Sequence, residues 1–129
     1  MSGNLKIDTR TRIVDENGAI VFGEGRHQIL LEVDELGSLA EVARHLGMSY
    51  RSVWGKINAT EERLGVKLVV RNSGRSKSSN TTLTPAARYL IEKFAKLDAA
   101  TRAFCEDAAD EVLNFHFNEN GEAAGKAPE

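Results

Sequence analysis

Residues 39–58, LAEVARHLGMSYRSVWGKIN, contain two helical patterns that meet at one glycine. Apolar residues recur in the first pattern at the three- and four-residue spacing of a helix face, and Val53 and Ile57 repeat that spacing in the second. Gly47 separates the two patterns, and glycine adopts backbone conformations that other residues resist. Ala43 is small enough for two helices to pack closely at the turn. The segment therefore predicts a helix-turn-helix in which one face of the second helix stays free.

Capping residues define where the expected helices begin. Ser38 is followed three residues later by Glu41, which is the pattern of a capping box at the start of the first helix of the pair. Ser49 is placed to cap the second helix, which we expect to run to about Leu64. A further amphipathic helix is expected over HQILLEVDEL, residues 27–36, directly before the pair.

Strand patterns lie on both sides of these helices. Residues 5–14 alternate between apolar and polar, DENG at 15–18 is a turn signal, and 19–22 return as a strand, which together predict an N-terminal β-hairpin. After the helices, the strands expected at 67–71 and 81–84 enclose the polar loop NSGRSKSSN. A helix-turn-helix followed by strand, loop and strand is the order of a winged helix. The expected fold class is mainly α with small β.

A long helix is expected from Pro85, because proline is well tolerated at the first helical position. Its apolar seam has heptad-like spacing, and spacing alone leaves open whether the seam packs on its own domain or on a second subunit. A helix of roughly 30 residues extends beyond so small a domain, which favours a homodimer. The seam residues predicted at the dimer interface are Leu90, Phe94, Leu97, Thr101, Phe104 and Ala108.

Three segments are expected from these patterns. Residues 5–84 form the winged helix-turn-helix domain with its hairpin, and residues 85–117 form the dimerisation helix. Residues 118–129, NENGEAAGKAPE, have too little apolar content to fold and are expected to be a disordered acidic tail.

Composition excludes several classes of protein. Hydrophobic residues make up 41% of the 129-residue chain, enough for one modest core, but no apolar run approaches the length of a membrane span. The N-terminus lacks the apolar segment of a secretory signal, and a single cysteine, Cys105, forms no internal disulfide. His27, His45 and His116 show no metal-ligand or catalytic spacing. We expect a cytoplasmic, non-enzymatic protein without metal or cofactor and without a membrane partner.

Charge is unevenly distributed along the chain. The net charge is −2, yet residues 41–80 hold eight basic and three acidic side chains, a local charge of +5. Residues 106–129 hold one basic and seven acidic side chains, a local charge of −6. The basic region coincides with the helix-turn-helix and the wing, which favours nucleic acid as a partner. A pair of solvated faces is the alternative.

The free face of the second helix is the expected reading surface for the major groove of DNA. Arg51 is the base-reading candidate, because a guanidinium bonds two acceptors on a guanine edge. Ser49 either bonds phosphate or only caps the helix, and Trp54 either contacts DNA or packs at the core rim. The candidate DNA contacts are Ser49, Tyr50, Arg51, Trp54, Lys56 and Asn58 on this helix, Arg44 before the turn, and Arg71, Arg75 and Lys77 in the wing.

Two longer segments of the sequence also carry a family resemblance. GRHQILLEVDELGSLAEVARHLGMSYRSVWGKIN resembles the N-terminal DNA-binding domain of the molybdate-dependent regulator (ModE) family. LGVKLVVRNSGRSKSSNTTLTPAARYLI is similar to the winged-helix segment of LysR-type regulators. The resemblance spans roughly residues 5–115 and implies a homodimer that presents two recognition helices to a palindromic operator. The effector-binding domains of both families begin where the 129 residues end, so none is expected among them.

Three functions remain open from the sequence. The first is a dimeric, sequence-specific, DNA-binding transcriptional regulator. The second is a winged-helix module for protein–protein interaction, which the acidic tail favours. The third, implied only by the resemblance, is a regulator that responds to a molybdate-type oxyanion bound at the dimer interface. Whether there is a small-molecule effector stays open.

Overall fold

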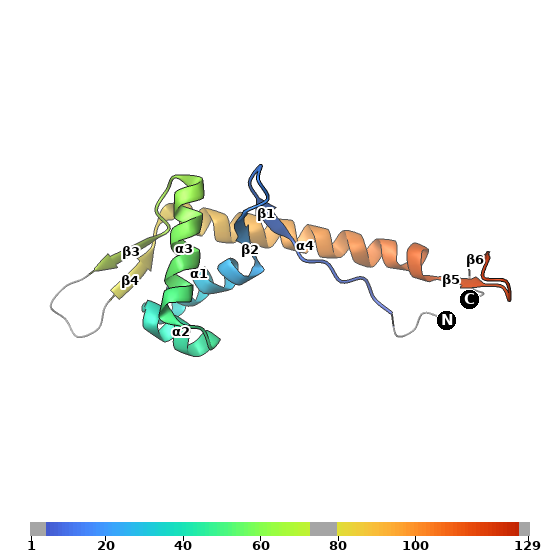
Figure 1. Cartoon of the computed structure of the whole chain (residues 1–129), viewed down its shortest axis with the longest axis horizontal. Coiled ribbons are helices and arrows are strands. Elements are labelled where there is room, and N and C mark those ends of the chain that lie inside the picture. The colour runs from blue at the N-terminus through green and yellow to red at the C-terminus, as the bar shows by residue number, and fades with distance from the viewer. Residues whose placement is uncertain (1–4, 73–79, 127–129) are drawn as a thin grey trace. The chain divides into compact units, whose positions relative to one another are not determined.

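The computed structural model describes residues 5–72 and 80–126. These residues form two compact units, one from Arg10 to Lys96 and one that combines the residues up to Thr9 with those from Leu97 onward. In chain order the elements are β1 (Arg12–Val14), β2 (Ile20–Gly23), α1 (Glu24–Leu36), α2 (Leu39–Leu46), α3 (Tyr50–Leu64), β3 (Val69–Asn72), β4 (Asn80–Leu83), α4 (Pro85–Leu113), β5 (Phe115–Phe117) and β6 (Ala123–Lys126) (Figure 1).

The helix-turn-helix forms as the sequence predicts. The Ser38 hydroxyl accepts a hydrogen bond from the backbone N–H of Glu41 at 3.3 Å and so caps α2. The Ser49 hydroxyl accepts one from the N–H of Ser52 at 3.0 Å and caps α3. Gly47 ends α2 with φ +67°, a left-handed conformation that disfavours side chains. The turn between α2 and α3 is thus fixed by a glycine and a serine cap.

One hydrophobic core holds the Arg10–Lys96 unit together. Val33 of α1, Val42 of α2 and Val53 of α3 are completely buried. Phe22 of β2 and Phe94 of α4 meet edge to face, with their ring centroids 5.3 Å apart. The core therefore includes the first turns of α4 as well as the helix-turn-helix.

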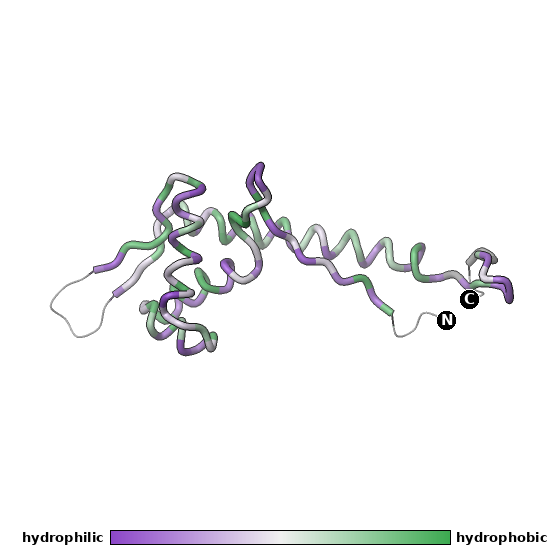
Figure 2. Tube along the Cα trace, in the orientation of Figure 1, coloured by the Kyte–Doolittle hydropathy of each residue, from purple (hydrophilic) through white to green (hydrophobic). Residues whose placement is uncertain are grey.

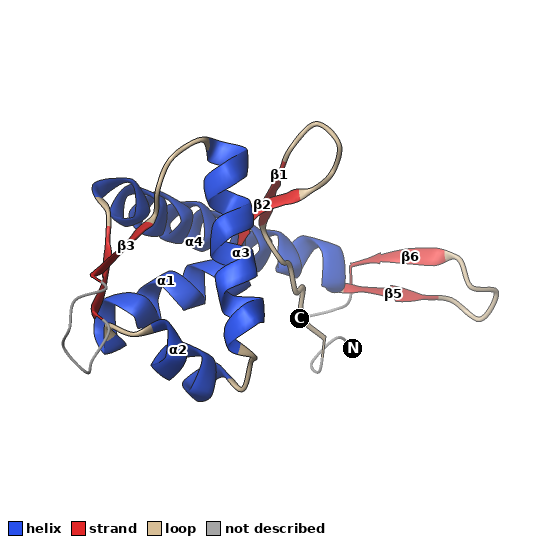
Figure 3. Cartoon of the chain, turned by 60° about the vertical axis from the view of Figure 1, so that its left-hand side comes forward, coloured by secondary structure: helices blue, strands red, loops and turns tan. Residues whose placement is uncertain are grey.

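The wing is the antiparallel pair β3–β4, with Val69 opposite Leu83. The buried Glu61 of α3 accepts hydrogen bonds from the N–H groups of Leu68 at 2.8 Å and Val69 at 3.3 Å, so the wing begins against α3. Figures 1 and 3 show α3 between β3–β4 on one side and β1–β2 on the other. The wing residues Arg75 and Lys77 lie outside the described part of the chain.

The first predicted strand is too long. The alternation of residues 5–14 predicted a strand of that length, but only Arg12–Val14 pair with β2. Alternation does not supply a partner strand, and β2 offers only Ile20–Gly23 before α1 begins at Glu24. The hairpin exists, but it is shorter than the pattern suggested.

The predicted division at residue 85 also differs from the structure. Residues 85–96 belong to the helix-turn-helix unit, because Ala87 and Phe94 are buried in its core and Arg88 pairs with Asp34 of α1 at 2.9 Å. The helix ends at Leu113, and not at residue 117 as predicted, because the chain turns into β5.

The tail predicted to be disordered over 118–129 contains an ordered turn. The side-chain oxygen of Asn118 accepts hydrogen bonds from the N–H groups of Asn120 and Glu122, both at 2.9 Å, and Gly121 takes φ +81°. This turn joins β5 and β6 as an antiparallel pair. The segment is ordered despite its low hydrophobicity, because the hydrogen bonds of Asn118 and the positive φ of Gly121 form a turn. Residues 127–129 are not among those described.

Two structural absences apply to residues 5–72 and 80–126. None of their helices is long and apolar enough to cross a membrane. They also contain no group of three or more His, Cys, Asp or Glu side chains that could hold a metal ion.

Candidate nucleic-acid interface

Helix α3 presents different residues in different directions, since successive residues are rotated by about 100° around a helix. Val53 and Ile57 point into the core and are 0% and 3% exposed. The opposite direction is taken by the strip of Arg51, Gly55 and Asn58, at a spacing of four and three residues. Arg51 and Gly55 are exposed and Asn58 is half-buried. This strip is a part of α3 that stays free for a partner.

Arg51 stands out because its charge has no partner within the described part of the chain. No hydrogen bond or ion pair from residues 5–72 or 80–126 reaches its guanidinium. Arg44 on α2, by comparison, pairs with Glu41 at 2.6 Å. An exposed, unpaired guanidinium on a free helix face is suited to bidentate contact with a base edge or a phosphate.

On the wing side of α3, an arginine lies against two aromatic rings. The guanidinium carbon of Arg71, on β3, is 5.8 Å from the Tyr50 ring centroid and 5.6 Å from that of Trp54. Tyr50 is 40% exposed, whereas Trp54 is half-buried and packs on the hydrophobic core. The structure therefore places Trp54 at the core rim under Arg71, and the cation–π contact positions the wing relative to α3.

On the hairpin side of α3, a second group of cations occurs that the sequence patterns did not single out. The backbone carbonyl of Lys56 accepts a hydrogen bond from Arg26 Nε at 3.3 Å, and Arg63 Nη1 donates to the carbonyl of Ile20 at 2.5 Å. The sequence held one signal for this group, because Lys56 and Arg63 are seven residues apart and therefore lie on the same face of α3. Arg26 could not be found this way, because it lies 30 residues from Lys56.

The predicted DNA contacts therefore fall into three places. Ser49, Tyr50 and Arg51 gather at the start of α3, with Trp54 and Arg71 beside them and Asn58 further along the outer strip. Lys56 faces the hairpin side, and Arg44 lies on α2. Ser49 caps the helix as an acceptor, because its hydroxyl oxygen takes the hydrogen bond from the N–H of Ser52, and its O–H stays able to donate to a phosphate.

A buried carboxylate ties α1 to α2 behind this surface. Glu32, 5% exposed, accepts a hydrogen bond from Gln28 Nε2 at 2.8 Å and also contacts His45 Nδ1. The hydrogen bonds from Gln28 and His45 lower the pKa of Glu32. The hydrogen bond to Glu32 and the charge of that carboxylate raise the pKa of His45. This pair supports the helix arrangement and leaves the outer strip of α3 untouched.

The predicted dimer seam divides into two parts. Leu90 and Phe94 pack within the chain's own core, and Phe94 is only 3% exposed. Leu97 is 45% exposed and Phe104 is 75% exposed, while Thr101 and Ala108 are intermediate. Apolar residues recur along the whole length of α4 (Figure 2). Only the second part of the seam is available to another molecule.

Three helices, a turn fixed by glycine, a two-stranded wing and an exposed strip on α3 define a winged helix-turn-helix DNA-binding domain. Residues 26–88 match the family model of the bacterial regulatory helix-turn-helix protein, lysR family. Residues 26–88 are thus similar to the helix-turn-helix domain of LysR-type regulators, and the chain also resembles ModE, as the sequence motifs predicted.

Individual relatives support the same class. The chain is 28% identical over 87 residues to the molybdenum-pterin-binding protein MopB of Rhodobacter capsulatus, covering 67% of this chain and 32% of that protein. It is 28% identical over 80 residues to the transcriptional regulator ModE of Haemophilus influenzae, covering 62% and 31%. The chain spans about a third of the length of these relatives.

A solved structure shares the fold. The crystal structure of the CbnR DNA-binding domain in complex with DNA superposes with a TM-score of 0.53 at 26% identity. The match covers 66% of this chain and 93% of that one.

Proposed function

We propose that the protein is a homodimeric transcriptional regulator that binds specific sequences of double-stranded DNA, with α3 in the major groove and the wing on the phosphate backbone. The observation that carries the proposal is the unpaired Arg51 on the outer strip of α3, beside an Arg71 that two aromatic rings hold in place. The relatives named as regulators, and the DNA complex of the CbnR domain, support the same reading.

Base recognition is assigned to the outer strip. Arg51 bonds two acceptors on a guanine edge, and Asn58 contacts DNA further along the same helix. Tyr50 bonds phosphate at the start of α3, because the N-terminus of a helix favours bound anions.

The remaining predicted contacts bind the backbone and set the register of α3. Arg71 contacts phosphate from the wing. Trp54 contributes indirectly, because its ring is one of the two that hold the guanidinium of Arg71. Lys56 and Arg44 contact phosphate from α3 and α2. Arg75 and Lys77, which the structure does not describe, are proposed to extend the wing contact.

The dimer is proposed to form between two copies of α4 through Leu97, Thr101, Phe104 and Ala108. Two observations support a second copy as the partner. A helix of 29 residues is about 44 Å long, and an exposed phenylalanine, Phe104, lies in the second part of its apolar seam. A symmetric pair also fits the palindromic operators of two-fold DNA-binding proteins.

We further propose that the protein acts without catalysis and in the cytoplasm. Its matched relatives include named regulators of transcription, and regulation of this kind needs binding alone.

Selection of bound fragments from a random DNA pool tests the proposal. The expected result is a palindrome with half-sites roughly 34–36 Å apart, or a multiple of one helical turn. Arg51→Ala is expected to relax the preference at one base pair per half-site by about 1–3 kcal/mol. Lys96→Gln, which removes an exposed charge paired with Glu92, is the matched control and leaves the selected sequence unchanged. Absence of any preferred sequence across a range of salt concentrations would overturn the proposal.

A further inference from the structure

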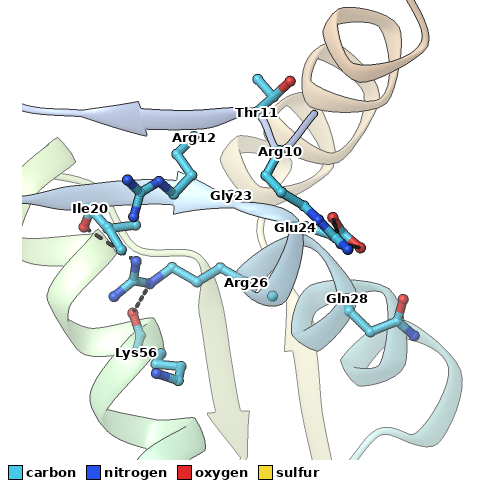
Figure 4. A pocket seen from close by; sticks show the side chains of 10 residues that line it. Arg10, Thr11, Arg12, Ile20, Gly23, Glu24, Arg26, Gln28 and Lys56 are labelled. Atoms are coloured by element: carbon cyan, nitrogen blue, oxygen red, sulfur yellow. Dashed lines mark hydrogen bonds and ion pairs between the residues drawn. The ribbon is translucent and has the colours of Figure 1, made fainter. Parts of the chain in front are cut away.

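A cavity of about 520 Å³ opens between the β1–β2 hairpin, the start of α1 and the middle of α3 (Figure 4). It is distinct from the outer strip of α3 and from the wing. Four basic side chains line it, Arg10, Arg12, Arg26 and Lys56, together with a single acid, Glu24. The cavity is therefore strongly positive in a chain whose net charge is −2.

Part of this charge remains unbalanced. Glu24 pairs with Arg10 at 3.1 Å, so the one acid lining the cavity is engaged with one of its four cations. Neither Arg12 nor Lys56 has a side-chain hydrogen bond or ion pair to any residue of the described ranges 5–72 and 80–126. Figure 4 shows the guanidinium of Arg26 bonded to backbone carbonyls. A carbonyl accepts a hydrogen bond, but it does not neutralise a cation.

Two arginines even share one acceptor. The carbonyl oxygen of Ile20 accepts from Arg26 Nη1 at 3.3 Å and from Arg63 Nη1 at 2.5 Å. Burial lowers the pKa of Arg26, and repulsion from the charge of Arg63 adds to this effect. An anion entering the cavity would relieve this repulsion and gain charge-assisted hydrogen bonds.

The position of the cavity indicates where such an anion comes from. α3 lies between the wing on one side and the β1–β2 hairpin on the other (Figures 1 and 3). A helix in the major groove, about 12 Å wide, has a phosphate strand on each side. Arg71 supplies a positive charge on the wing side of α3, and the basic cavity supplies positive charge on the hairpin side.

We propose that this cavity binds a phosphate of the DNA backbone on the side of α3 opposite the wing, so that the recognition helix is held by phosphate contacts on both sides. The proposal rests on the DNA-binding function proposed above and adds a second backbone contact to it. Arg12 and Lys56 bond the phosphate oxygens. Arg26 is a positioning residue, because its bonds to Ile20 and Lys56 fix the hairpin against α3.

The test measures DNA affinity by fluorescence anisotropy as a function of salt, with the selected operator and a scrambled duplex. Each phosphate contact that is lost makes the slope of log affinity against log salt shallower by about 0.9. Arg12→Gln/Lys56→Gln is therefore expected to reduce the slope by about 0.9 for each cavity and to weaken both duplexes by a similar factor. Arg12→Lys/Lys56→Arg keeps both charges and is expected to keep the wild-type slope. Lys96→Gln is the control for loss of a distant charge.

The outcomes separate this inference from the proposed function. Wild-type protein that selects no sequence contradicts the proposed function. Wild-type protein that selects a sequence, while the double glutamine variant keeps the wild-type slope, overturns this inference, together with the phosphate contact proposed for Lys56, and leaves sequence recognition by α3 intact. Calorimetry of the DNA-free protein with inorganic phosphate adds a further arm. Binding of free phosphate that the double variant abolishes, with the DNA slope unchanged, would assign the cavity to a small anion and overturn the DNA contact.

Discussion

Residues 85–96 and 97–113 of α4 continue one apolar repeat in different surroundings. In the first segment, Phe94 is 3% exposed and packs on Phe22 and His27, with ring centroids 5.3 and 5.2 Å away. In the second, Phe104 is 75% exposed. His27 Nε2 also lies 3.2 Å from the Ile91 carbonyl, within hydrogen-bonding distance, so the first segment is fixed to the helix-turn-helix by polar as well as apolar contacts.

The contrast shows what a heptad-like repeat does and does not encode. The repeat specifies a helix with an apolar stripe, but the partner of that stripe depends on which residues the rest of the chain brings to it. Phe22 and His27 meet the stripe at residue 94. At Phe104 the stripe stays largely exposed, which is why the dimer is proposed there.

The largest expected effect comes from truncating the buried ring. Phe94→Ala should lower the free energy of unfolding by about 3–5 kcal/mol, because it removes a buried aromatic side chain and leaves a cavity. Urea denaturation at fixed protein concentration measures this loss. Phe104→Ala is the matched control and should change unfolding of the helix-turn-helix unit by less than about 0.5 kcal/mol. Equal losses in the two variants would contradict the division of α4.

The next effect should appear in association. Phe104→Asp places a charge on the exposed seam and should weaken dimerisation by about 2 kcal/mol, roughly 30-fold in the dissociation constant. Sedimentation equilibrium over a range of protein concentrations measures the shift from dimer to monomer. Glu106→Gln, an exposed change off the seam on the same helix, should leave association unchanged. If Phe104→Asp associates as tightly as wild type, the proposed interface is wrong.

Sequence patterns predicted those parts of the fold whose determinants are local. Serine caps and glycines with positive φ fixed the ends of α2 and α3, and apolar spacing identified Val53 and Ile57 as core residues. Each of these signals depends on residues within one or two helical turns. The N-terminal strand was predicted too long for the opposite reason, since its length depends on a partner strand elsewhere in the chain.

In the candidate site, too, local features could be predicted and contacts between distant segments could not. The outer strip of α3 follows from helix geometry once the core face is known. The contact of Arg71 with Tyr50 and Trp54 could not be predicted, because it spans the turn from α3 to β3. The contact of Arg26 with Lys56 could not be predicted either, because the two residues lie in different helices and only the fold brings them together.

A smaller effect should distinguish two glycines within the helix-turn-helix. Gly47→Ala should destabilise the unit by about 1–2 kcal/mol, because φ +67° is strained for a residue with a Cβ atom. Gly55→Ala should stabilise it by about 0.5–1 kcal/mol, because Gly55 lies inside α3 and an added Cβ would meet no atom within 4 Å. Both are measured by urea denaturation in the Phe104→Asp background, in which the helix-turn-helix is studied with association weakened. Changes of the same sign would contradict the assigned backbone roles.

The smallest expected effect is a pH dependence that belongs to the Arg10–Lys96 unit alone. The raised pKa of His45 means that its stabilising contribution is complete below about pH 6.5, the value for an unfolded chain, and is lost as pH rises through the higher folded value. The lowered pKa of Glu32 acts in the opposite direction, so its contribution is present above about pH 4.3 and is lost as pH falls through the lower folded value. The pair should therefore stabilise most between about pH 4.3 and 6.5.

Urea denaturation from pH 5 to 9 measures this dependence, with His45→Gln as the comparison. The stability difference between wild type and variant should shrink as pH rises above about 6.5, because the imidazole loses its proton and its charge opposite Glu32. Phe104→Ala should follow the wild-type profile, since the exposed seam holds no part of this pair. A difference between wild type and His45→Gln that stays constant over this range would show that His45 acts by packing, not by its charge.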